Sequence, residues 1–112
     1  MAVRMNKAWR ALEPEAIAAL PGHLGVFQLG DDDGNIVLIG CADARTKFGL
    51  RGELQDILAA PPPLATQFRI ESTMAYRTRH LELLQVYVHD HGTLPSANTG
   101  IDITRLGVIG PS

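Results

Sequence analysis

The sequence has one cysteine, few aromatic residues and no long apolar run, and each shortage excludes a class of protein. Cys41 is the single cysteine among 112 residues, so there is no internal disulfide, and we expect a reducing, cytoplasmic location. No stretch approaches the roughly 20 apolar residues of a membrane span, so no membrane partner is expected. Because aromatic residues make up only 5% of the chain, aliphatic side chains must supply most of the core.

A basic excess is also missing, since 10 Lys and Arg stand against 12 Asp and Glu. Proteins dedicated to nucleic acids usually carry such an excess, because their cations displace counterions from phosphates. The balance therefore argues against tight binding by the whole surface and leaves room for a local basic patch. At this length we expect a single domain over residues 1–112, with a core from about 14 to 98 and extensions at 1–12 and 99–112.

The stretch from Gly25 to Gly40 predicts a hairpin of two short apolar strands joined by an acidic turn. Asp and Gly tolerate the positive φ of tight turns, which places the turn at Asp31 to Gly34. The second strand is apolar on both faces, so we expect it to be central in the sheet and covered by helices above and below.

Helical spacing and breakers place three helices around this hairpin. We expect a short helix from Pro14 that Pro21-Gly22 ends, a second helix over about 48–59, and a third that Ser72 or Thr73 caps and that runs to about His91. The third helix is expected to bury a stripe of Tyr76, His80, Leu84, Tyr87 and Val88.

Alternating residues from Thr66 to Glu71 predict an edge strand, and a further short strand is possible around 101–109. The expected fold is α/β in composition and α+β in arrangement. It is a three-stranded antiparallel sheet flanked by helices.

GVF at 25–27 and LIG at 38–40 lie about ten residues apart and resemble the two tripeptides of the GIY-YIG nucleases. A helix carrying LRGEL, a strand, a long helix with an internal glutamate, and a closing Pro95 and Asn98 follow in the order of that family. The resemblance covers about residues 21–98. It implies a small mixed domain that cuts one DNA strand with two tyrosines, an arginine, a metal-binding glutamate and an asparagine.

Carried over to this sequence, the resemblance gives Gly25, Phe27, Leu38 and Gly40 as the motif positions. The two tyrosines fall on Phe27 and Leu38, which cannot take or relay a proton, so we expect weakened or lost hydrolysis. Tyr76 would then have to replace one of the lost tyrosines.

The remaining catalytic positions of the resemblance are Arg51, Glu82 and Asn98. The arginine maps to Arg51, with Glu53 by strict helical register and Arg45 as alternatives. Glu82 is the implied ligand of Mg²⁺ or Mn²⁺, which are expected only if the domain is active. A solvated Glu82 paired with Arg79 is the competing interpretation, and Asn98 also suits an ordinary turn.

Three further candidate sites have simpler explanations. DDDG does not fit a calcium loop, because Leu29 and Gly40 would occupy its first and last ligand positions. His89 and His91 lie two residues apart and diverge on a helix, so they complement the helix C-terminus better than they bind a metal. Cys41 has no histidine beside it in the sequence, so a small buried or half-buried thiol is expected.

Three functions remain open on these residues. The first is a divergent, nucleic-acid-related domain of the GIY-YIG kind that still binds DNA and, if active, is a metal-dependent endonuclease. The second is a catalytically silent module that binds a protein partner or a second copy of itself. The third is a small-molecule or metal-binding domain that uses the His-rich end of the long helix.

Overall fold

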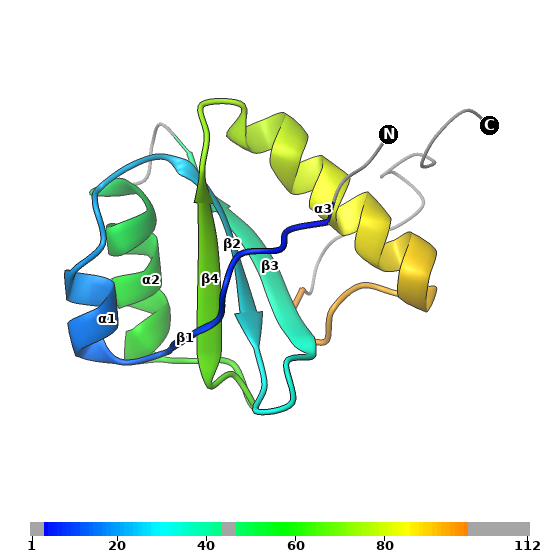
Figure 1. The fold of residues 1–112 in the computed structure, drawn as a ribbon, viewed down its shortest axis with the longest axis horizontal. Helices are drawn as coiled ribbons and strands as arrows, with labels where there is room; N and C mark the ends of the chain where they lie inside the picture. Colours follow the sequence, from blue (N-terminus) through cyan, green and yellow to red (C-terminus); the bar gives the residue numbers. More distant parts are fainter. Residues whose placement is uncertain (1–3, 44–46, 99–112) are drawn as a thin grey trace.

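The computed structural model describes residues 4–43 and 47–98 and shows one sheet between two helical layers (Figure 1). All strand pairs are antiparallel, in the order β1-β4-β2-β3. In chain order the elements are β1 (Arg10–Ala11), α1 (Pro14–Ala18), β2 (Gly25–Gly30), β3 (Ile36–Ala42), α2 (Gly49–Ala59), β4 (Gln67–Ser72) and α3 (Tyr76–His91).

Helices α1 and α2 cover one face of the sheet and α3 covers the other (Figure 1). Alternation along β2 supplies both cores, because Phe27 and Leu29 point to the α1–α2 side while Val26 points to α3. The expected mixed α+β domain, with an antiparallel sheet flanked by helices, is therefore confirmed.

The hairpin turn forms where the sequence placed it. The Asp31 carboxylate accepts hydrogen bonds from the backbone N–H groups of Asp33 and Asn35, both at 2.9 Å. Gly34 takes the left-handed conformation, at a φ of 84°. These bonds hold the acidic turn without help from the helices.

The expected strand count is wrong, since the sheet has a fourth strand. Strand β1 has only two residues, and it forms through pairing with β4 at Phe68 and Gln67. Two residues are too few to show an alternating pattern in the sequence. The strand is defined by its pairing with β4 and not by its own residues. As a result β4 lies inside the sheet and is not the edge strand that its alternation predicted.

Strand β3 is at the edge of the sheet, so its expected central place is also wrong. Its two apolar faces are still explained, because both helical layers reach it. The backbone of residues 95–98 then runs along its open side, where the Ala97 N–H donates to the Val37 carbonyl at 3.0 Å. The possible strand at 101–109 lies outside the described residues.

Helix α3 ends at His91 as expected, and Gly92 follows it in the left-handed conformation. Its buried residues are Leu83, Leu84 and Val86, so the predicted stripe contained only one of them. The N-terminal segment accounts for this shift, because Met5 packs beside Leu83 and widens the covered side of the helix. Neither Ser72 nor Thr73 is the N-cap residue, which is Ala75.

Candidate functional site

The motif glycines are places where the backbone leaves no room for a side chain. A Cβ on Gly40 would lie 2.3 Å from the Cζ atom of Phe27, whose ring covers Gly40 on the neighbouring strand. A Cβ on Gly25 would lie 2.2 Å from the carbonyl oxygen of Glu71. Both glycines are thus required by close packing between strands.

Phe27 and Leu38 belong to the apolar core on the α1–α2 side. The Phe27 ring is 1% exposed, and the half-buried Leu38 packs against the same cluster. Neither side chain carries a group that can transfer a proton, and the side chains of this cluster are apolar throughout. The two positions therefore stabilise the hairpin and contribute no acid or base.

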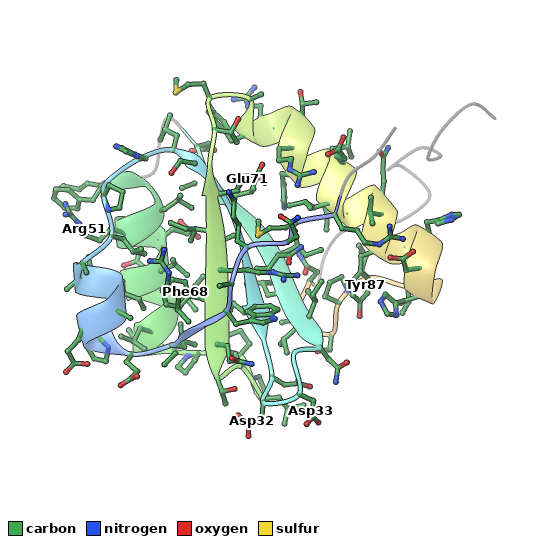
Figure 2. All side chains as sticks on the ribbon, viewed as in Figure 1. Asp32, Asp33, Arg51, Phe68, Glu71 and Tyr87 are labelled. Carbon is green, nitrogen blue, oxygen red and sulfur yellow. The ribbon has the colours of Figure 1, made fainter. Side chains whose placement is uncertain are left out.

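Arg51 lies on α2, on the α1–α2 side of the sheet (Figure 2). Its guanidinium donates a hydrogen bond of 3.4 Å to the carbonyl of Leu20 and lies 5.8 Å from the centre of the Phe48 ring. Arg51 is thus close to the loop after α1.

Glu82 lies on α3, which covers the opposite face, and it forms an ion pair with Arg79. Arg79 also donates to both carboxylate oxygens of Glu71 on β4, at 2.7 and 3.1 Å. Burial disfavours the charge of Arg79, but its bonds to Glu71 and Glu82 outweigh burial and raise its pKa. The pairing of Glu82 with Arg79, the competing interpretation, is confirmed.

Asn98 is bound to the backbone of the edge strand. Its side-chain oxygen accepts from the Ile39 N–H at 2.8 Å, and its nitrogen donates to the Ile39 carbonyl at 2.9 Å. His80 on α3 lies 3.3 Å from the same carbonyl, and burial lowers the pKa of this histidine. Asn98 therefore acts as an extension of the sheet.

The three predicted catalytic residues are not brought together. Arg51 is on the α1–α2 side, Glu82 is on the α3 side, and Asn98 is at the edge of the sheet, with no contact among them in the described chain. Of the alternative arginine positions, Arg45 lies outside the described residues. Glu53 is a half-buried carboxyl whose pKa is raised first by burial and then by Asp56 and Asp43.

Cys41 is half-buried, which is one of the two placements that the sequence left open. Burial, followed by the nearby Asp43 and Glu53 carboxylates, raises its pKa. A raised pKa keeps the thiol protonated, which disfavours nucleophilic chemistry.

Sequence reasoning missed an exposed aromatic residue at the start of α2. Phe48 is 56% exposed and takes the left-handed conformation, with φ 64° and ψ 18°, at the N-cap position of the helix. The Lys47 ammonium and the Arg51 guanidinium lie 5.4 and 5.8 Å from the ring centre. We name these three residues the Phe48 surface. The available signal was a bulky apolar residue where N-caps favour Ser, Thr, Asp or Asn.

A groove of about 490 Å³ lies near the Phe48 surface. Its walls are the segment from Gly22 to Leu24, before β2, and the segment from Ser72 to Met74, after β4. The backbone joins the groove to the aromatic residue, because the Leu50 N–H at the start of α2 donates to the His23 carbonyl at 2.8 Å. Met74, at 79% exposed, forms part of the lining.

Within residues 4–43 and 47–98, no three His, Cys, Asp or Glu side chains gather as the ligands of one ion. Among the helices of this part of the chain, none has both the length and the apolar character that a bilayer span requires.

These features define a small α+β domain whose motif positions pack the sheet and whose exposed aromatic residue, Phe48, lies close to two cations. The chain belongs to the family described as Domain of unknown function (DUF7508), whose match spans residues 3–90. No curated protein and no solved structure matches the chain.

Proposed function

We propose that this protein is a GIY-YIG-like domain that binds single-stranded nucleic acid and does not cut it. The likeness is supported by the arrangement of the hairpin, in which Phe27 lies opposite Gly40 on adjacent antiparallel strands. The order of the following helix, strand and long helix supports it too.

The loss of cutting is supported by the side chains that occupy the implied catalytic positions. Phe27 and Leu38 carry no proton-transfer group, and Glu82 is held by Arg79 on the face away from Arg51. Phosphodiester hydrolysis needs a base, a cation and a metal-binding carboxylate around a single phosphate. Residues separated by the sheet do not meet that requirement.

The observation that carries the binding proposal is the backbone conformation of Phe48. A left-handed conformation costs a residue other than glycine about 1–3 kcal/mol, and such strain gathers at functional sites. Here the strained residue is 56% exposed, and the charged groups of Lys47 and Arg51 lie 5.4 and 5.8 Å from its ring centre. Unpaired bases stack on aromatic rings that have cations nearby. Such a local surface does not require a basic excess over the whole protein.

The test is fluorescence anisotropy with labelled single-stranded and double-stranded oligonucleotides at about 50 and about 200 mM salt. We expect the protein to prefer single strands and to bind more weakly at the higher salt. Phe48→Gly should weaken binding by about tenfold, because stacking of a base on an aromatic ring is worth about 1–3 kcal/mol. The same variant should be slightly more stable, because glycine adopts the left-handed conformation without strain.

Leu64 provides the matched control. It is also exposed and left-handed, with a φ of 73°, but it is not aromatic and is not part of the Phe48 surface. Leu64→Gly should gain stability and keep its affinity. Absence of binding at the lower salt, or equal binding by Phe48→Gly, would refute the proposal.

Two further assays separate the alternatives. Supercoiled plasmid incubated with Mg²⁺ or Mn²⁺ should stay intact, and nicking that Glu82→Ala abolishes would restore the endonuclease hypothesis. Sedimentation velocity of the free protein tests the alternative of a silent interaction module. A dimer that persists without nucleic acid and dissociates in Met74→Ser would favour that alternative.

A further inference from the structure

A small cavity of about 100 Å³ lies between the N-terminal segment, the sheet and α3. Gln28 on β2 and Arg69 on β4 form its polar wall, and Met5, Leu83 and Val86 contribute to its apolar wall. A water molecule takes about 30 Å³ in the liquid, so the cavity has room for roughly three waters or one ligand of that size.

Arg69 brings a positive charge to this wall without a carboxylate partner among the described residues. Its Nε donates to the Gln28 side-chain oxygen at 2.7 Å, and its Nη1 donates to the Lys7 carbonyl at 3.4 Å. The guanidinium also lies 4.2 Å from the centre of the Trp9 ring. By contrast, Arg4 at the same cavity is neutralised by Asp90, at 2.9 Å. The polar wall therefore carries one positive charge, that of Arg69, which no carboxylate of the described residues neutralises.

Gln28 is 2% exposed, and its side chain adds a free donor. Because a guanidinium can only donate, the Gln28 atom that faces Arg69 is Oε1, which leaves Nε2 turned away from it. Nε2 has no acceptor in the described chain, although every fully buried side-chain nitrogen and oxygen there has a partner. Nε2 therefore opens onto the cavity, with two hydrogens to donate.

We propose that this cavity binds a short-chain carboxylate such as propionate. The carboxylate accepts hydrogen bonds from Arg69 and from the Gln28 amide, and the alkyl end lies against Met5, Leu83 and Val86. One uncompensated cation suits a monoanion better than a phosphate dianion, and the apolar wall suits a hydrocarbon end. Tyr87 and His91, whose ring centres are 4.2 Å apart, also line the cavity.

Trp9 is the single tryptophan of the sequence and stacks on Arg69, so its fluorescence reports on this wall. The protein would be titrated with propionate, with propionamide as the neutral isostere and with inorganic phosphate. The Gln28 side-chain amide would be followed in parallel by NMR. We expect saturable changes in both signals with propionate, and much weaker changes with the other two compounds.

Two variants and a control test whether propionate binds at this wall of the cavity. Arg69→Gln should weaken propionate binding by about tenfold, because it removes a charged hydrogen bond. Val86→Phe keeps Arg69 and should abolish binding by filling the cavity, so the test survives if Arg69→Gln does not fold. Arg10→Gln, at an exposed cation on β1, should bind like the wild type.

The proposal is overturned if propionate gives no saturable change, if propionamide or phosphate binds equally well, or if a folded Arg69→Gln protein keeps its affinity. Equal binding by Val86→Phe would also overturn it. None of these measurements contains nucleic acid, so their failure leaves the role of the Phe48 surface untouched.

Discussion

The two faces of the sheet are built differently, although the same strands supply both. Toward α1 and α2 the core cluster contains only apolar side chains, among them Phe27 and Leu54. Toward α3 the apolar cluster is smaller and adjoins the buried Gln28, the half-buried His80 and the Arg79 ion pairs. The contrast indicates that the interior on the α1–α2 side is held by apolar packing alone, while the interior on the α3 side also contains polar groups.

Polar groups are costly in a core unless each is hydrogen-bonded, because burial removes the water that would solvate it. In the described part of the chain every fully buried side-chain nitrogen and oxygen has a partner, and the side-chain nitrogen of Gln28 opens onto the cavity. The following predictions test whether the two faces differ in the way that their side chains indicate.

The largest effect is expected when the same substitution is made on each face. Leu54→Ala should lower the free energy of unfolding by about 3–5 kcal/mol, because the α1–α2 core would retain a void. Leu83→Ala should cost less, about 2–3 kcal/mol, because one side of Leu83 already borders a cavity and loses fewer contacts. Urea unfolding followed by circular dichroism measures both values. Equal losses would show that the two cores are packed equally well.

A smaller effect is expected from the ion pairs of the α3 face. Arg79→Met should cost about 1–3 kcal/mol, because it leaves the part-buried carboxylates of Glu71 and Glu82 without their partner. Arg4→Met serves as the control, since it breaks a pair in which the arginine side chain is 65% exposed. The control should unfold at the same urea concentration as the wild type. If both variants lose similar stability, the Arg79 pairs are no better than surface pairs.

The smallest effect is a pH dependence that His80 should contribute on the α3 face. Burial lowers the pKa of His80 from its ordinary value of 6.5, so below that value the unfolded chain binds more protons than the folded one. The free energy of unfolding should therefore fall as the pH drops from about 7 to about 5.5. His80→Gln keeps a donor for the Ile39 carbonyl and does not titrate, so its unfolding should depend less on pH. An unchanged slope would show that other groups cause the dependence.

Local sequence patterns predicted correctly those elements that are determined by residues close together in the chain. The hairpin formed at the apolar strands of the Gly25 to Gly40 stretch, and the acidic turn appeared where Asp31 and Gly34 indicated. The helix ends at Ala59 and His91 were also correct, because proline and glycine stop helices through their own backbone restrictions.

The features that the sequence did not reveal depend on distant contacts. Strand β1 exists because β4 lies beside it, and Leu83 is buried in a cluster that includes Met5 from the distant N-terminal segment. The separation of Arg51 from Glu82 by the sheet was equally hidden, since a motif gives the order of residues but not the face on which each lies. The Phe48 surface went unnoticed because its exposure contradicts the usual preference of an aromatic side chain for the core.

Strand β3 has its outer hydrogen-bonding groups occupied at Val37 and Ile39 by residues 97 and 98. An exposed strand edge is a template on which further chains can assemble into fibrils. Because the two hydrogen bonds of Asn98 occupy backbone groups of this edge strand, they should also hinder the pairing of further chains with β3. A chain cut before Pro95 would keep both helical layers of the sheet and should lose its solubility over time, even where the domain itself still folds.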